Sequence, residues 1–280
     1  TTVPMTIEYF LRGQIGYMKE RGFEVIAVSS PGEALDRVAA REGIEVVAIP
    51  MERGVSVRSD LKALVDLFRL FRRIRPAIVH ASTGKAGPLG IMAAVLARVP
   101  VKVYGLRGLM VDRRAGLAQL KVKILEWVTC LCADRVIAVS RSIADYMIRE
   151  GLCSAGKIEI PADGSSNGVD AVNRFNPRKV TPALAGSFRE KCGIPRDGLV
   201  IGFVGRLVAG KGISELAQAW AAIRKKHQDV ILFLAGSPES QDPVPDSVLH
   251  ALRTDKRVIM ADSVSNEEMP LFYSNVDLVV

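Results

Sequence analysis

Cysteine, histidine and aromatic residues are scarce in this sequence. Its 280 residues include four cysteines, three histidines and 6% aromatic residues. The cysteines show neither a C-x-x-C spacing nor a disulfide framework, which predicts reduced thiols and a cytoplasmic protein; they stand at positions 130, 132, 153 and 192. No histidine has a second ligand at a recognisable spacing, so we expect no metal site.

Long apolar runs are also missing. No run reaches the roughly 18 residues that a membrane-spanning helix needs. The best candidate, LGIMAAVLARVPVKVYGL, is interrupted by Arg98, Pro100 and Lys102. Basic residues are not interleaved with aromatic ones, which argues against a nucleic-acid partner.

Positive charge is in moderate excess. The net charge is +8, and residues 1–170 hold 24 Lys and Arg against 18 Asp and Glu. Such an excess fits phosphorylated substrates or an anionic membrane surface, with an ordinary solvated surface as the alternative.

Short β-branched runs alternate with helix-length segments throughout the chain. The runs stand at 23–30, 44–50, 77–81, 101–106, 135–140 and 157–161, and a second series at 199–205, 230–236, 257–261 and 276–280. Nearly continuous apolar strands separated by helices predict parallel sheets covered on both faces. We therefore expect an α/β fold of two doubly wound, Rossmann-like domains, with a ligand cleft at the carboxyl ends of their strands.

A stretch rich in Gly, Ser, Asn and Pro separates the two series of strands. It predicts a first domain at 1–170, a linker at 171–196 and a second domain at 197–280. The chain opens with a loop running into a helix near 7–21 and closes on a strand that no helix follows. We expect a longer gene product, with the first strand missing here and the second domain incomplete.

The stretch GRLVAGKG at 205–212 resembles an ATP-type phosphate loop, but Gly212 stands where that loop needs a metal-binding hydroxyl. It follows a predicted strand and precedes an amphipathic helix. Arg206 and Lys211 would then stand beside the unpaired amides of a helix start and hold a diphosphate without a metal. A solvated turn with Arg206 on the surface is the alternative.

Polar residues follow two predicted strands of the first domain. His80 ends the strand at 77–81, where a sugar-positioning role and a structural role are both open. Thr83 and Lys85 stand at the next helix start and are candidates for acceptor binding, with helix capping as the alternative for Thr83. Arg107 ends the strand at 101–106 and is a candidate for binding a phosphate.

Five segments together resemble the retaining glycosyltransferases of family 4, with the GT-B fold, and especially the bacterial enzymes of capsule, O-antigen and exopolysaccharide assembly. They are IVHASTGKAGPLGIMAA, YGLRGL, ADRVIAVSRSIADYM, GSSNGVDAVNRFNP and VGRLVAGKGISELAQAW. The resemblance covers essentially the whole chain.

That resemblance implies a division of labour between the two domains. The first would bind a lipid-linked or saccharide acceptor, and the second a nucleotide-sugar, expected to be a UDP-sugar, with no other cofactor. The donor diphosphate would be bound at Gly205, Arg206 and Lys211, and His80 would lie near the donor sugar and the acceptor. A non-catalytic fragment that binds a glycan-assembly complex or a membrane, and a nucleotide-sugar 2-epimerase, are the alternatives.

The helical segment 58–75 collects arginines near its end. It predicts either a core helix with a cationic C-terminus or peripheral attachment to the inner face of an anionic membrane. The arginines are Arg69, Arg72, Arg73 and Arg75, and Arg113, Arg114, Lys121 and Lys123 would extend the surface.

Overall fold

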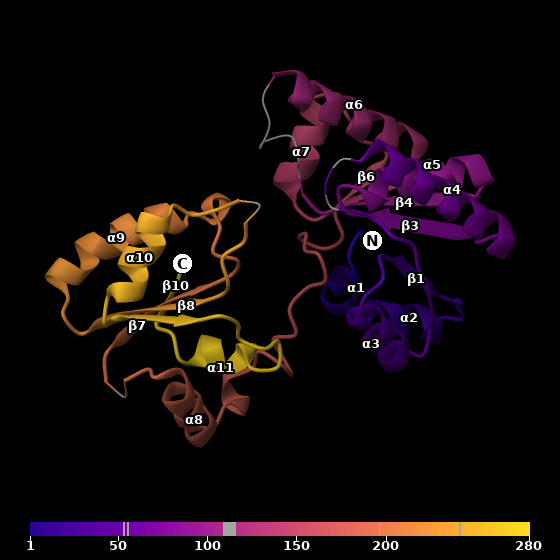
Figure 1. Ribbon diagram of the computed structural model, residues 1–280. Coiled ribbons are helices and arrows are strands. Elements are labelled where there is room, and N and C mark those ends of the chain that lie inside the picture. The colour runs from indigo at the N-terminus through magenta and orange to yellow at the C-terminus, as the bar shows by residue number, and fades with distance from the viewer. Residues whose placement is uncertain (53, 55, 109–115, 196, 241) are drawn as a thin grey trace. The chain divides into compact units, whose positions relative to one another are not determined.

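The computed structural model describes residues 1–52, 54, 56–108, 116–195, 197–240 and 242–280. It divides into two compact units, Thr1–Gly168 (unit 1) and Val169–Val280 (unit 2). Each unit contains parallel strands connected by helices, which confirms the predicted α/β class (Figure 1).

Unit 1 follows the predicted alternation of strands and helices. Its strands are β1 (Ile26–Ser29), β2 (Glu45–Ala48), β3 (Ile78–Ser82), β4 (Val101–Leu106), β5 (Arg135–Ala138) and β6 (Ile158–Glu159). Its helices are α1 (Pro4–Phe10), α2 (Gln14–Glu20), α3 (Glu33–Glu42), α4 (Val57–Ile74), α5 (Ala86–Ala97), α6 (Gly116–Cys132) and α7 (Arg141–Arg149).

The strands of unit 1 form a pair, β1-β2, and a four-stranded sheet in the order β3-β4-β5-β6. Helix α5 packs on β3 and β4 and lies between α4 and α6. It is apolar around its whole circumference, as expected for a helix with neighbours on several sides. Its buried residues join Tyr104 and Leu106 of β4 in the main core of the unit.

Unit 2 contains the second series of strands. These are β7 (Leu199–Val204), β8 (Val230–Ala235), β9 (Val258–Ala261) and β10 (Leu278–Val279), in the spatial order β10-β7-β8-β9. The helices are α8 (Pro182–Cys192), α9 (Ile213–Lys226), α10 (Asp246–Thr254) and α11 (Met269–Ser274), with 3-10 turns η2 (Pro177–Lys179) and η3 (Ala209–Lys211).

Strand β8 is buried along its whole length. Leu232 and Leu234 belong to one hydrophobic cluster, whereas Phe233 and Ala235 belong to another. Because successive side chains of a strand point to opposite faces, these two clusters cover the two faces of the sheet. This is the double coverage that the continuous apolar runs predicted.

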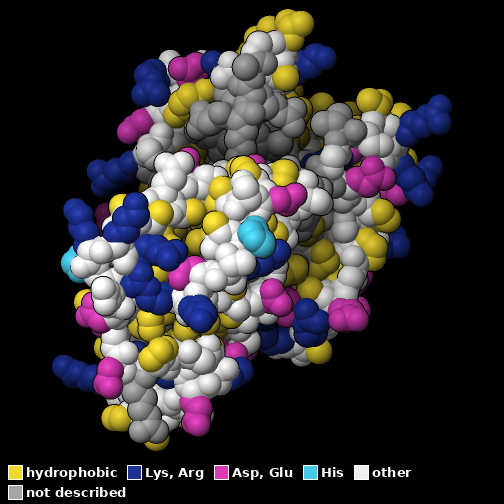
Figure 2. Space-filling view, turned by 60° about the vertical axis from the view of Figure 1, so that its left-hand side comes forward, with side chains coloured by type: hydrophobic (Ala, Val, Ile, Leu, Met, Phe, Trp, Pro, Cys, Tyr) yellow, Lys and Arg dark blue, Asp and Glu magenta, His cyan; other side chains and the backbone are white. Residues whose placement is uncertain are grey.

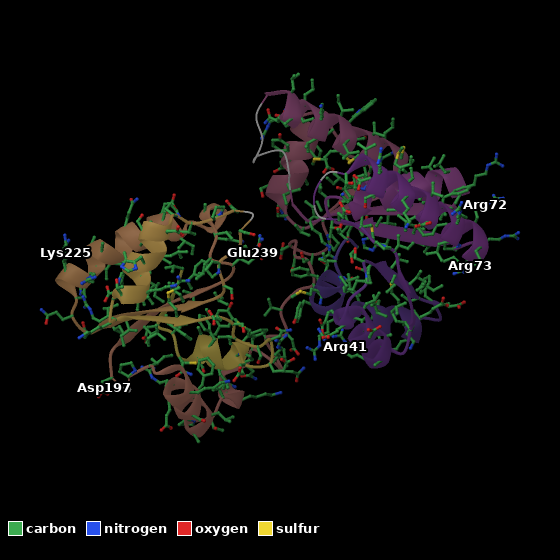
Figure 3. The ribbon with its side chains drawn as sticks, in the orientation of Figure 1. Arg41, Arg72, Arg73, Asp197, Lys225 and Glu239 are labelled. Carbon is green, nitrogen blue, oxygen red and sulfur yellow. The ribbon has the colours of Figure 1, made fainter. Side chains whose placement is uncertain are left out.

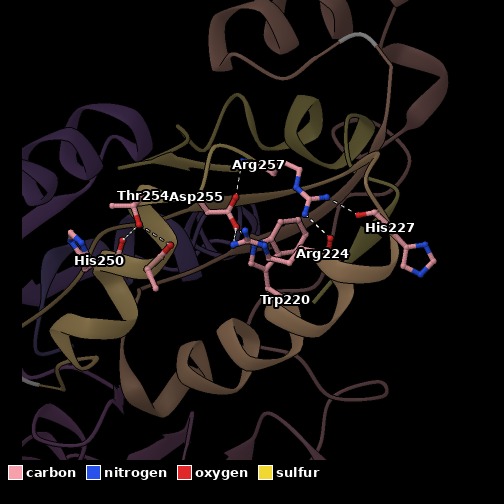
Figure 4. Close-up of polar contacts among 8 residues, drawn as sticks. Trp220, Arg224, His227, His250, Thr254, Asp255 and Arg257 are labelled. Atoms are coloured by element: carbon pink, nitrogen blue, oxygen red, sulfur yellow. Dashed lines mark hydrogen bonds and ion pairs between the residues drawn. The ribbon is translucent and has the colours of Figure 1, made fainter.

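A polar cluster fastens the end of α9 to the segment between α10 and β9 (Figure 4). Asp255 Oδ2 accepts hydrogen bonds from Trp220 Nε1 at 2.9 Å and from Arg224 Nη1 at 2.5 Å. Arg257 donates to the carbonyl oxygens of Arg224 and His227, both at 2.7 Å. These contacts hold the indole of Trp220 in the core of unit 2, where it is 3% exposed.

Three segments differ from the sequence-based expectation. The helix expected near 7–21 is divided into α1 and α2, with Gly13 in a left-handed conformation between them. Residues 171–196, expected to form a linker, belong to unit 2 and include α8, whose Phe188 packs in the core. In α4, where the periodicity of 58–75 places Leu61 on the same face as Leu64 and Phe68, Leu61 is 60% exposed.

Candidate functional site

The carboxyl ends of β3 and β4 bring His80 and Arg107 close together in unit 1. The strands pair in parallel with His80 opposite Val103 and Ser82 opposite Gly105. A Cβ atom on Gly105 would lie 2.9 Å from His80 Nε2 and 2.8 Å from Ser82 Cβ. The missing side chain at Gly105 therefore leaves the space that the imidazole ring occupies.

The surroundings of His80 keep its ring neutral. Burial of the ring, followed by the positive charge of Arg107, lowers the pKa of His80 to about 4, although the residue as a whole is exposed to solvent. At neutral pH the imidazole therefore has one N–H donor and one nitrogen acceptor. It can position a hydroxyl group without placing a second positive charge beside Arg107.

Arg107 has unused hydrogen-bonding capacity. Its Nε and Nη1 atoms are shielded from solvent and have no hydrogen-bond partner among the described residues. The guanidinium carbon lies 5.8 Å from the centroid of the Phe10 ring, and burial lowers the pKa of the group. Because buried donors without partners are costly, an anion placed here would gain strong, charge-assisted hydrogen bonds.

Thr83 and Lys85 already have partners within unit 1. The hydroxyl of Thr83 lies 2.8 Å from that of Thr2 and accepts a hydrogen bond from the Thr2 amide at 3.2 Å. Lys85 Nζ lies 2.6 Å from Asp60 Oδ1 and also donates to the carbonyl of Gly54. Both side chains thus hold neighbouring segments together in this structure.

The loop from β7 to α9 forms the candidate anion site of unit 2. Leu207 forms a parallel bridge with Pro238, so the loop continues beside the segment that follows β8. The Gly205 amide donates to the Ala235 carbonyl at 2.9 Å, and a Cβ on Gly236 would lie 1.8 Å from the Gly205 oxygen. Only glycine fits at position 236, where φ is 152°.

The two cations of this loop have different surroundings. Arg206 Nη1 lies 2.7 Å from Glu239 Oε2, and both side chains are partly exposed; Figure 3 shows Glu239 on the loop after β8. Lys211 is exposed, and no ion-pair partner for it is found among the described residues. Arg206 would have to exchange Glu239 for a phosphate, whereas Lys211 would not.

Helix α9 begins directly after Lys211. Its N-cap residue is Gly212, with φ 73°, and no side chain caps the helix. The first amides of a helix have no acceptor within the helix, and the helix dipole favours an anion there. Gly210 N is already occupied, since it donates to Asp242 Oδ2 at 3.0 Å. The available donors are therefore the amides of the first turn of α9 and the two cationic side chains.

The structure thus groups the predicted residues into two sets, one in each unit. His80 and Arg107 lie together at the strand ends of unit 1, and Gly205, Arg206 and Lys211 share one loop of unit 2. No sequence pattern pointed to Glu239 or Phe10, because neither lies in a motif. The fold brings Glu239 to Arg206 and Phe10 to Arg107. The other two histidines, His227 and His250, are exposed and lie in unit 2 outside this loop.

Neither a metal cluster nor a spanning helix is found in the described ranges. No group of three or more His, Cys, Asp or Glu residues there could hold a metal ion. None of the described helices is long and apolar enough to cross a membrane. On the face shown in Figure 2, lysines and arginines are dispersed among acidic and hydrophobic side chains.

Two parallel-sheet α/β units, each with polar groups at the ends of its strands, are typical of an α/β protein that binds ligands at the carboxyl ends of its strands. Comparison with known families is more specific. Residues 6–162 match the Glycosyl transferase 4-like domain, and residues 186–280 match the Glycosyl transferases group 1 family. The chain therefore belongs to the family 4 glycosyltransferases of GT-B fold, as the five sequence segments predicted.

Two curated relatives and one solved structure illustrate the relationship. The capsular polysaccharide biosynthesis glycosyltransferase CapM of Staphylococcus aureus is 32% identical over 271 residues, which are 96% of this chain and 68% of CapM. The UDP-Gal:alpha-D-GlcNAc-diphosphoundecaprenol alpha-1,3-galactosyltransferase of Escherichia coli is 28% identical over 74% of this chain and 52% of its own length. Anabaena Alr3699/HepE, solved with UDP and glucose, superposes with a TM-score of 0.73 at 20% identity, covering 100% of this chain and 71% of that chain.

Proposed function

We propose that this chain transfers a sugar from a nucleotide-sugar, with UDP-sugars as the first candidates, to a lipid-linked saccharide in bacterial surface-polysaccharide synthesis. The observation that carries the proposal is the cationic loop of unit 2, which combines Arg206 and Lys211 with the uncapped start of α9. The relationship to a capsular glycosyltransferase and to an enzyme named for a diphosphoundecaprenol acceptor supports the choice of substrates.

The donor site would act on the charge that forms as the sugar leaves. Departure of the nucleoside diphosphate places negative charge on its phosphate and positive charge on the anomeric carbon. Arg206, Lys211 and the first amides of α9 would stabilise the phosphate more strongly in the transition state than in the ground state. With these groups meeting the leaving phosphate, we propose a metal-independent transfer. We propose retention of the anomeric configuration on the family relationship alone.

The acceptor would bind at the strand ends of unit 1. The two shielded donors of Arg107 would take a phosphate oxygen of a lipid-linked saccharide, and the neutral ring of His80 would position a sugar hydroxyl. Thr83 and Lys85 would form the wall of this site, since their polar groups are already bonded to Thr2 and Asp60. We place the reaction in the cytoplasm, at the inner face of the membrane that holds such an acceptor.

Calorimetry with UDP, GDP and ADP, each with and without Mg²⁺, tests the donor site. We expect one nucleotide to bind without Mg²⁺, and binding to weaken by at least about tenfold in both Arg206→Ala and Lys211→Ala. Lys225→Ala is the matched control, because Lys225 is an exposed cation at the far end of α9 (Figure 3). Equal affinities in all four proteins would exclude this loop as the diphosphate site.

A second pair of assays separates transfer from the alternatives. Incubation with the nucleotide-sugar alone would reveal 2-epimerisation, whereas sugar transfer requires the acceptor. NMR analysis of the product anomer tests retention, and an inverted product would contradict it. Nucleotide binding with neither reaction would favour a non-catalytic role for this chain.

A further inference from the structure

Helix α6 presents an apolar stripe to solvent. Its members recur at spacings of three and four residues and lie on one face of the helix; they are Leu117, Leu120, Ile124, Trp127 and Leu131, with exposed fractions of 77%, 52%, 51%, 47% and 58%. The stripe runs from Leu117 to Leu131, so its ends are about 21 Å apart along the helix. Buried Val122 and Cys130 lie on the inner face. Figure 1 shows α6 along the outside of unit 1.

The charged side chains that α6 itself contributes beside this stripe are both lysines. Lys121 is exposed, and Lys123 lies 2.6 Å from Glu150 at the end of α7. Glu126, the single carboxylate of α6, is turned inward and accepts a hydrogen bond from the Tyr104 hydroxyl at 2.9 Å. Burial, the largest influence, raises the pKa of Glu126. The outer surface of α6 therefore combines large apolar side chains with lysines and carries no exposed carboxylate.

Helix α4 differs, although its arginines made it the sequence-based candidate for a membrane surface. Arg72 and Arg73 point away from its C-terminal end (Figure 3), but Leu67, Leu70 and Phe71 are buried in the core. Its strongly exposed apolar residues, Val57 and Leu61, lie near its start, far along the helix from the arginines. Of the other residues expected to extend that surface, Arg113 and Arg114 lie outside the described residues.

A second copy of the chain fits the α6 stripe poorly. In a helix pair formed through this stripe, Lys121 and Lys123 would occupy the flanking positions that usually carry complementary charges. Lys123 is compensated by Glu150, but both copies would contribute Lys121 there, which opposes self-association. An anionic lipid surface instead attracts the lysines and receives the apolar side chains, including the tryptophan that favours a membrane interface.

We propose that α6 is the membrane-docking surface of this protein and lies in the plane of an anionic bilayer, with its apolar stripe inserted among the lipid headgroups. This surface goes beyond sugar transfer and does not require a bound nucleotide. It would hold unit 1 at the membrane without a spanning helix. Insertion would move Trp127 into the apolar boundary, whereas Trp220 stays in the core of unit 2.

Co-sedimentation with vesicles tests the proposal. We expect the 280-residue protein to bind vesicles of phosphatidylcholine with phosphatidylglycerol and to bind pure phosphatidylcholine much more weakly. The double variant Leu120→Ser, Ile124→Ser should lower vesicle affinity by at least about tenfold, because two inserted side chains are lost. Lys121→Glu should weaken binding to anionic vesicles and leave binding to neutral vesicles unchanged.

The controls are a leucine variant on another helix, a tryptophan variant that reports insertion, and a check of folding. Leu61→Ser removes an equally exposed leucine from α4 and should bind vesicles normally. Tryptophan emission should shift to shorter wavelength on vesicle binding, and Trp127→Phe should abolish the shift while retaining most of the binding. Circular dichroism confirms that each variant is folded.

Three results would overturn the proposal. Failure of the unmodified protein to bind anionic vesicles would exclude docking, and normal binding of the folded double variant would exclude α6. Lipid-free dimerisation that the double variant abolishes would assign the stripe to a second copy. Because every measurement is made without nucleotide, these outcomes are distinct from failure of the proposed donor site.

Discussion

The candidate sites of the two units hold their positive charges in different surroundings. In unit 1, two donor atoms of Arg107 are shielded from solvent, and the guanidinium influences the neighbouring His80. In unit 2, Arg206 and Lys211 are exposed, and Arg206 is paired with Glu239. Charges that are shielded from water act more strongly on their neighbours, whereas exposed charges are screened by water and salt. The difference suits a site that positions one group and a loop that receives and releases a diphosphate.

Close packing also differs between the two sites. In unit 1, a Cβ on Gly105 would meet side-chain atoms of His80 and Ser82. In unit 2, a Cβ on Gly236 would meet the backbone of Gly205. A side chain can turn away at a small cost, but the backbone cannot move without displacing the strands. The loop at 205–212 is therefore fixed by main-chain geometry, and His80 by side-chain packing.

The largest expected effect is that of Gly236→Ala on the stability of unit 2. We expect the free energy of unfolding to fall by about 3 kcal/mol or more, because the new Cβ meets backbone at a positive φ. Gly186→Ala, in α8 with no atom within 4 Å of the new Cβ, should instead stabilise by about 0.5–1 kcal/mol. Urea titrations compare the stabilities of the two variants. A Gly236→Ala protein as stable as the parent would show that the backbone at Gly236 need not lie against that at Gly205.

Arg206→Ala should affect turnover more than any change in unit 1. We expect kcat to fall by roughly 100–1,000-fold with saturating substrates, equivalent to about 2.7–4 kcal/mol, since the lost charge acts on the leaving phosphate. Arg107→Ala should mainly raise the KM for the acceptor, because we propose that this group binds a part of the acceptor that does not react. Steady-state kinetics with each substrate varied would separate the two sites; a kcat unaffected by Arg206→Ala would contradict this assignment.

The titration of His80 should show the influence of its surroundings in unit 1. NMR of its imidazole protons should give a pKa of about 4, well below the value near 6.5 of an exposed histidine. Between these values the unfolded chain binds more protons than the folded one, so this residue lowers stability as the pH falls from about 6.5 to about 4.

Arg107→Gln should raise the pKa of His80 by part of that difference, because burial is the larger cause and remains. The His80→Asn variant identifies the resonance. A pKa near 6.5 in the unmodified protein would mean that the His80 ring is freely solvated. The site of unit 1 would then be as open to solvent as the loop with Arg206 and Lys211 in unit 2.

The smallest effect concerns the competition for Arg206. Glu239→Gln removes its partner, and the affinity for the nucleoside diphosphate should rise about threefold at low salt and less at high salt. Asp197→Asn is the control, because it changes the net charge equally at an exposed position outside the loop. Equal gains in both variants would indicate a general charge effect and would leave the Arg206–Glu239 pair without influence on binding.

The sequence by itself determined the α/β class, the two series of parallel strands and the loop that joins a strand to α9 at Arg206 and Lys211. These features follow from periodicity and spacing within short segments, which a single chain displays directly. Only the tertiary structure decided that Lys85 is paired with Asp60, Arg206 with Glu239 and Glu126 with Tyr104. It also decided which face of α6 is exposed and how far the pKa of His80 falls. The physical reason is that burial and pairing depend on residues far apart in the sequence, which only the packing of helices on sheets brings together.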